Sequence, residues 1–320
     1  MKFYPLKLKP ITKYAIWGGK RIWEQYAIGS KDEDTAEAWM LSCRNDGVNI
    51  IENGEYAGMT LDRYIDQAGK ENVFGKDSFP LFIKIIDASD KLSVQVHPDD
   101  SYATSHGLDA GKTEMWYILD SKPGAVLVSG IKQGITAKTV CQAAEKGECE
   151  EYLNYVPVKK GDVFFIPAGL VHAIGEGILI AEVQQNSNTT YRLYDYDRKD
   201  KDGNKRELHI KRAEEVIKTE FDISDAVVNG KPVCAGKVTE QTVCRCGYFS
   251  VKKIEMNKDT EKEFTTDGKM THILCLDGSG YIKCNGFAEK INKGDSFLLP
   301  KCIDGYSLCA KENMEMLMSV

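Results

Sequence analysis

Four side chains between residues 95 and 172 are of the types that hold a divalent metal ion. Gln95 and His97 lie two residues apart in a strand-like segment, so both side chains point to the same face. Glu114 begins the next apolar segment, and His172 follows a turn rich in Gly and Pro. Two imidazoles, a carboxylate and an amide oxygen form a nitrogen–oxygen ligand set that suits a divalent metal with one position open to substrate or water.

Each histidine taken singly is a weak signal. A histidine at the end of a strand, such as His97, is more often a solvated loop residue than a ligand. The order of the motifs is far more specific: Gln-x-His on a strand, then Glu, then Gly-Asp-(x)4-Pro-x-Gly-(x)2-His over residues 161–172. The other histidines are interpreted as ordinary surface or core residues: His106, His209 and His272.

Strand patterning dominates the segments that must position these residues. Short runs rich in β-branched residues, each ended by a polar or proline break, are typical of a barrel or sandwich. We expect strands at residues 82–87, 92–97, 115–119, 125–128, 162–167 and 178–183. Helical patterning is sparser. It predicts helices over residues 60–68, 136–147 and 212–219, the first two capped by Thr60 and Thr136.

A second β-rich region follows a turn that ends at Pro232. We read residues 224–232 as an interdomain connection and expect strands at 248–254, 272–276, 280–284 and 296–299. Residues 293–300 closely repeat residues 160–167, which indicates an internal duplication, but no histidine follows Pro300. We therefore predict a metal-binding catalytic domain over residues 1–225 and a degenerate β-domain without ligands over residues 236–320.

Composition and charge narrow the classes of protein. The 320 residues are 42% hydrophobic and 28% charged, which is enough for a sizeable core, and the net charge of -6 does not favour nucleic acid. The amino terminus lacks the apolar core of a signal peptide, and there is no run of about eighteen apolar residues, so we expect no membrane association. With ten scattered cysteines and no export signal, we expect reduced thiols and a cytoplasmic location.

The motif over residues 161–172 resembles the second conserved motif of cupins, and the wider pattern is similar to type I mannose-6-phosphate isomerases in their short bacterial form. Residues 17–19 and 37–39 fit the amino-terminal part, and the resemblance covers most of residues 10–215. It implies a mainly β fold with two cupin-type β-barrel or jelly-roll domains and a few short helices. The stretches that carry it are 81–88, 92–99, 111–114, 166–174, 182–187 and 190–198.

The resemblance implies one Zn²⁺ per chain, bound by Gln95, His97, Glu114 and His172. Short forms are often described with the His-Glu-His set alone, which leaves the role of Gln95 open. The implied activity is the interconversion of mannose 6-phosphate and fructose 6-phosphate through a cis-enediol. A metal ion would stabilise the charge that builds on the sugar oxygens.

Further positions match residues with roles in that family. Arg192 matches an arginine treated as catalytic, and Lys112 and Ser93 match positions that line the substrate pocket. The base stays open among Lys112, Glu182 and a metal-bound hydroxide. The ordinary interpretations are a solvated turn for Lys112, a hydrogen-bonded barrel residue for Glu182, and for Arg192 an ion pair with Asp195 or Asp197.

Two other functions fit part of the pattern. A cupin oxygenase would use iron at the same ligands, would need oxygen, and would not need a phosphate contact. A non-catalytic sugar-binding cupin would keep the fold without turnover. The set of Lys112, Ser93 and Arg192 favours the isomerase. We expect a small sugar phosphate as its partner, and the chain as a monomer or weak homodimer.

Overall fold

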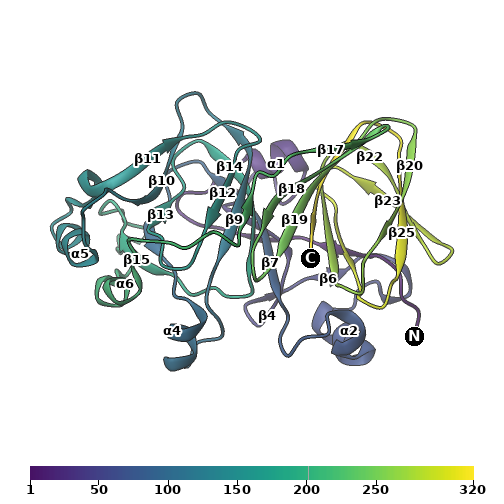
Figure 1. Ribbon diagram of the computed structural model, residues 1–320, viewed down its shortest axis with the longest axis horizontal. Coiled ribbons are helices and arrows are strands. Elements are labelled where there is room, and N and C mark those ends of the chain that lie inside the picture. The colour runs from purple at the N-terminus through teal and green to yellow at the C-terminus, as the bar shows by residue number, and fades with distance from the viewer. Residues whose placement is uncertain (201) are drawn as a thin grey trace.

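The computed structural model describes residues 1–200 and 202–320. Two β-rich units lie side by side, with short helices around them (Figure 1). The mainly β fold that strand periodicity predicts is therefore confirmed. The helices are α1 (Arg21–Tyr26), α2 (Leu61–Ala68), α3 (Lys70–Val73), α4 (Asp100–Ser105), α5 (Ala137–Glu145) and α6 (Ile210–Val216), with 3-10 turns η1 (Gly54–Tyr56) and η2 (Cys149–Tyr152).

Two facing antiparallel sheets build the amino-terminal unit. One has the order β12 (Val163–Ile166), β9 (Glu114–Ser121), β14 (Ile178–Gln185), β7 (Leu81–Ala88), β3 (Glu37–Leu41), β2 (Ile11–Lys13). The other has the order β11 (Leu153–Pro157), β10 (Val126–Ile131), β13 (His172–Ala173), β8 (Val94–Val96), β15 (Tyr191–Tyr194). A small hairpin joins β4 (Cys43–Arg44) to β5 (Gly47–Val48).

The central strand β14 is buried on both faces, but the two faces differ in chemistry. Val183 and its neighbours on one face are apolar, whereas Glu182 and Gln184 lie on the other, because successive side chains of a strand alternate. The register places Glu182 opposite Trp116 on β9 and opposite Lys84 on β7. Polar groups therefore line one end of the interior between the two sheets, whereas Ile178 and Ile180 on the same face of β14 belong to an apolar cluster.

The carboxy-terminal unit also has two sheets. The longer has the order β16 (Val227–Val228), β18 (Val238–Arg245), β19 (Ser250–Met256), β26 (Met314–Ser319), β21 (Thr271–Asp277), β24 (Ser296–Leu299), β1 (Leu6–Lys9), β6 (Ile50–Ile51), with β17 (Val233–Ala235) on β18. The shorter has the order β20 (Thr260–Thr265), β25 (Gly305–Ala310), β22 (Ser279–Cys284), β23 (Phe287–Asn292). In the described residues each unit thus consists of two separate sheets rather than one closed barrel.

One hydrophobic core joins the two units. The outer faces of β9 and β14 pack against the long sheet of the carboxy-terminal unit, which lies next to them in Figure 1. Hydrogen bonds cross this interface: Tyr117 Oη donates to Glu315 Oε1 at 2.7 Å, and Ser296 Oγ donates to the carbonyl of Met40 at 2.6 Å. His272 lies behind the second bond, its Nε2 2.8 Å from Ser296 Oγ.

Several elements differ from their sequence-based expectation. The third helix begins at Ile210, two residues before its predicted start, and ends at Val216. Thr136 caps α5 as predicted by accepting from the Thr139 amide, but Thr60 makes no such bond because its hydroxyl contacts Asp62. The expected connection over 224–232 contains β16, which pairs with β18.

The first strand of the chain, β1, belongs to the carboxy-terminal sheet, where it pairs with β24. The domain division at residues 225 and 236 remains a prediction. In the part of the chain that the structure describes, no helix has both the length and the apolar character needed to cross a bilayer.

Candidate metal centre

His97, Glu114 and His172 come together between the two sheets of the amino-terminal unit, as their order in the sequence predicts. Their ligand atoms lie within 4.8 Å of one another. His97 Nε2 is 3.1 Å from His172 Nε2 and 2.7 Å from Glu114 Oε1, while His172 Nε2 is 4.0 Å from that oxygen. All three side chains are at most 1% exposed. Glu114 begins β9, His172 begins β13, and His97 directly follows β8.

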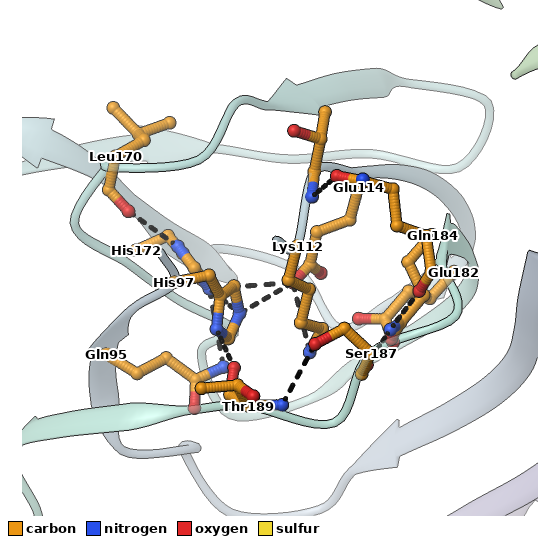
Figure 2. Close-up of polar contacts among 12 residues, drawn as sticks. Gln95, His97, Lys112, Glu114, Leu170, His172, Glu182, Gln184, Ser187 and Thr189 are labelled. Atoms are coloured by element: carbon orange, nitrogen blue, oxygen red, sulfur yellow. Dashed lines mark hydrogen bonds and ion pairs between the residues drawn. The ribbon is translucent and has the colours of Figure 1, made fainter. Parts of the chain in front are cut away.

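Backbone carbonyls fix both imidazole rings. Nδ1 of His97 lies 2.9 Å from the carbonyl oxygen of Thr189, and Nδ1 of His172 lies 2.8 Å from that of Leu170 (Figure 2). A carbonyl can only accept, so each Nδ1 carries the proton. Burial lowers the pKa of both histidines, and for His97 the nearby charge of Lys112 lowers it further. Both rings are therefore neutral, with the Nε2 lone pairs turned to the centre.

This arrangement is unfavourable without a cation. Two imidazole lone pairs and a carboxylate oxygen face one another, and no proton is available between them. Glu114 Oε1 is buried and accepts no hydrogen bond from the described residues, although the Lys112 ammonium lies 3.3 Å away as an ion pair. Two neutral nitrogens and one anionic oxygen, each already oriented, are the donor set of a divalent metal site. The residues present therefore fit a metal ion.

Gln95 is within reach of the same centre. It lies opposite His172 in the sheet, and its Nε2 is 3.3 Å from His172 Nε2. Rotating the amide by half a turn exchanges its nitrogen for its oxygen, and the oxygen would then be a ligand at that point. Gln95 is thus placed where a fourth ligand would lie, but its amide would have to turn to present the oxygen.

Glu182 lies next to Glu114, and a tryptophan links the two carboxylates. Trp116 Nε1 donates to Glu114 Oε2 at 2.7 Å and approaches Glu182 Oε2 at 3.2 Å. Burial and the charge of Glu114 raise the pKa of Glu182. Burial would also raise the pKa of Glu114. The charge of Lys112, whose Nζ is 3.3 Å from Glu114 Oε1, outweighs burial and lowers the pKa of Glu114. Trp116 is fully buried and thus combines a core position with a polar link between the two carboxylates.

Lys84 is a buried charged residue near the centre that the sequence-based predictions did not include. Its Nζ lies 3.4 Å from Glu182 Oε1 and 3.4 Å from Glu37 Oε2, and 4.5 Å from the ring centroid of Phe82. Burial alone would lower the pKa of Lys84, but the charges of the neighbouring carboxylates outweigh burial and raise it. A lysine in the middle of the mainly apolar strand β7 was the available signal, because a charge in a buried strand needs a partner.

Arg192 lies on the edge strand β15, where it pairs with Gln95 on β8. Its Nη1 donates to the carbonyl of Glu207 at 2.7 Å, and its Nε is buried without a partner among the residues described. The alternative ion pair with Asp195 is not observed, because Arg198 and Arg206 occupy that carboxylate. Arg192 is thus free of carboxylate partners in the described part of the chain, and burial lowers its pKa.

Ser93 and Lys112 differ in their relation to the centre. Lys112 is buried beside Glu114, so the solvated turn expected as its ordinary interpretation is wrong. Ser93 is buried just before β8, but within the described residues no hydrogen bond joins its side chain to the metal-site groups.

Comparison with known proteins places the chain in a family. Residues 6–129 match the profile of the phosphomannose isomerase type I catalytic domain, and residues 239–319 match the mannose-6-phosphate isomerase cupin domain. Mannose-6-phosphate isomerase ManA of Bacillus subtilis (strain 168) is 39% identical over 315 residues, which span 95% of this chain and 97% of that protein. The chain belongs to the type I mannose-6-phosphate isomerase family.

Solved structures of mannose-6-phosphate isomerases share the fold. The crystal structure of the Bacillus subtilis enzyme has a TM-score of 0.90 at 32% identity and covers 99% of both chains. A zinc-bound mannose 6-phosphate isomerase has a TM-score of 0.74 at 15% identity, with 98% of both chains covered, and supports the fold alone. The cupin-type architecture that the family resemblance implies is confirmed.

Proposed function

We propose that this protein is a zinc-dependent aldose–ketose isomerase that interconverts mannose 6-phosphate and fructose 6-phosphate. Membership of the mannose-6-phosphate isomerase family over nearly the whole chain supports the reaction. The observation that carries the metal dependence is the convergence of acceptor atoms from His97, Glu114 and His172 on one buried point. A mannose 6-phosphate isomerase with the same fold has been solved with zinc bound, which agrees with this donor set.

In this proposal His97, Glu114 and His172 hold a single zinc ion, and Gln95 is a fourth ligand once its amide turns. When bound, zinc supplies Lewis acidity that stabilises negative charge on the sugar oxygens by several kcal/mol, without redox side reactions. The carbonyls of Leu170 and Thr189 keep both imidazoles oriented before substrate arrives, which reduces the cost of assembling the site.

Lys112 and Glu182 are the two side chains proposed to move the proton. The reaction takes a proton from C2 of the open-chain aldose, protonates the carbonyl oxygen on C1 to give a cis-enediol, and returns a proton to C1 as the C2 hydroxyl becomes a carbonyl. Both residues lie beside Glu114, Lys112 by its ion pair and Glu182 through the shared Trp116 N–H. Lys84 would act as a positioning residue by keeping the Glu182 carboxylate in place.

Arg192 is proposed to bind the anionic substrate. A half-buried guanidinium without a carboxylate partner in the described structure can offer its planar donors to a phosphate or a developing oxyanion. Burial and the charge of Arg206 lower the pKa of Arg192, whereas the charges of Asp195 and Glu207 act in the opposite direction. Ser93 stays a proposed pocket residue on family resemblance alone.

A coupled assay with the purified chain tests this function. Mannose 6-phosphate should yield fructose 6-phosphate, a chelator should abolish turnover, and added zinc should restore it with one ion per chain by metal analysis. Equal rates with and without oxygen would separate the isomerase from an iron oxygenase. Bound zinc with no turnover would instead support a sugar-binding cupin and would refute the proposed reaction.

A further inference from the structure

Gln184 lies in the interior beside the metal centre and has no role in the function proposed above. It follows Glu182 by two residues on β14, so both side chains are on the same face. Its Cα is paired with Glu114 on β9 and with Phe82 on β7, and the residue is fully buried. Figure 2 shows it next to Glu182 and Ser187.

The orientation of the Gln184 amide is fixed by its partners. Nε2 donates to the carbonyl oxygens of Gln185 at 2.9 Å and Ser187 at 2.5 Å. Both partners can only accept, so the assignment of nitrogen and oxygen is unambiguous. Oε1 is left buried, and no donor from any residue that the structure describes reaches it.

Side-chain donors in this part of the interior are already paired with carboxylates. Trp116 Nε1 serves Glu114 and Glu182, Lys112 pairs with Glu114, and Lys84 pairs with Glu182. An acceptor buried without a donor is unfavourable, so such atoms call for an explanation. A bound metal ion would be a partner for Glu114 Oε1, and the Lys84 ammonium is a partner for Glu182 Oε1. Neither is a partner for the amide oxygen of Gln184.

We propose that Gln184 Oε1 accepts a hydrogen bond from one non-reacting hydroxyl of the bound sugar phosphate and so helps to select the substrate. This inference rests on the proposed isomerase function. An open-chain sugar phosphate presents hydroxyl donors along its carbon chain, which complements an interior rich in acceptors. A sugar that lacks the hydroxyl in question leaves the buried oxygen unpaired, so the site discriminates against it.

The test combines a variant with deoxy substrates. Wild-type enzyme and Gln184→Met are assayed on mannose 6-phosphate and on its 3-, 4- and 5-deoxy analogues, and the zinc content of each preparation is measured. For wild type we expect one deoxy analogue to lose about tenfold to a hundredfold in kcat/KM relative to mannose 6-phosphate. In Gln184→Met the parent sugar should fall to near the rate of that analogue, so the preference disappears while zinc stays bound.

Gln185→Met is the matched control. It removes the neighbouring amide, which lies on the opposite face and contacts the Thr113 amide and Asp100. Its effect should be equal on all four sugars. If Gln184→Met does not fold, Gln184→Ala removes the same oxygen without placing a thioether against the two carbonyls, and the same readout applies.

A uniform loss on every sugar in the Gln184 variant would overturn the inference. The amide would then serve only the turn over residues 185–189, whose Thr189 carbonyl orients His97. Loss of zinc together with uniform loss of rate would have the same meaning. Failure of the wild-type enzyme to isomerise mannose 6-phosphate would instead refute the proposed function itself, so the two outcomes are distinct.

Discussion

The Nε2 atoms of His97 and His172 face each other at 3.1 Å, and neither carries a proton that could bridge them. The second nitrogen of each ring is held by a carbonyl oxygen, so neither ring can relieve the contact by changing tautomer without losing a hydrogen bond. Glu114 Oε1 likewise lies 2.7 Å from His97 Nε2 with no proton between the two atoms. The three side chains thus form a centre that is electrostatically incomplete without a bound cation.

Replacing one ligand should remove the metal and the activity together. We expect His172→Ala to lose both zinc retention and turnover, because one ligand of a small set is removed and the remaining donors bind a divalent ion far less tightly. Metal analysis after desalting, together with the isomerase assay, measures both effects. The exposed His106 is the matched control, and His106→Ala should keep both. Full activity in His172→Ala would refute the site assignment.

Arg192→Ala should separate substrate binding from metal binding. Zinc content should stay at the wild-type level, while kcat/KM falls about tenfold to a hundredfold because a charge-assisted hydrogen bond to the anionic substrate is lost. Arg63→Ala, at an exposed arginine on α2, serves as the control and should behave as wild type. Zinc loss in the Arg192 variant would mean that the arginine is structural.

Lys84→Met should destabilise the fold. The change leaves the buried carboxylate of Glu182 and the partly exposed carboxylate of Glu37 without their shared cation, so the free energy of unfolding should drop by about 3–5 kcal/mol in a urea titration. Adding Glu182→Gln should recover part of that loss, because it removes one of the two unpaired charges. Equal stability of Lys84→Met and wild type would show that the ion pairs contribute nothing.

His272 should make the stability pH-dependent. Burial lowers its pKa from 6.5 to about 3, so between these values the unfolded chain binds a proton at His272 that the folded chain does not. Stability therefore falls as the pH drops below 6.5, by about 1.4 kcal/mol per pH unit from this residue.

The matched variant for this effect is His272→Gln, which keeps a neutral donor toward Ser296. Urea unfolding at about pH 7.5 and about pH 5 should show wild type losing about 2 kcal/mol more than the variant between the two conditions. Parallel losses in both proteins would contradict the assignment, because His97 and His172 titrate alike in each.

The sequence predicted the parts of the site that have a local pattern. The two-residue spacing of Gln95 and His97 already placed both on one face, and the expected strand 296–299 coincides with β24. The carbonyls of Leu170 and Thr189 could not be predicted, because every residue has a carbonyl and only the fold decides which one meets a ring.

Long-range pairing explains the other differences. β1 joins β24 across nearly the whole chain, and no periodicity within Leu6–Lys9 indicates its partner. The ion pairs of Lys84 depend likewise on the register of β7 against β3 and β14. Predicting them would have required the sheet order in addition to the strands.

The core shared by the two units gives the carboxy-terminal unit, which contributes none of the proposed metal ligands, a role in covering β9 and β14. Met115 and Tyr117 alternate along β9 with Glu114 and Trp116, and they pack against the carboxy-terminal sheet. In a fragment ending near residue 225, the apolar side chains on the outer face of β9 would be exposed to water. We expect such a fragment to aggregate on expression even though it contains every proposed zinc ligand.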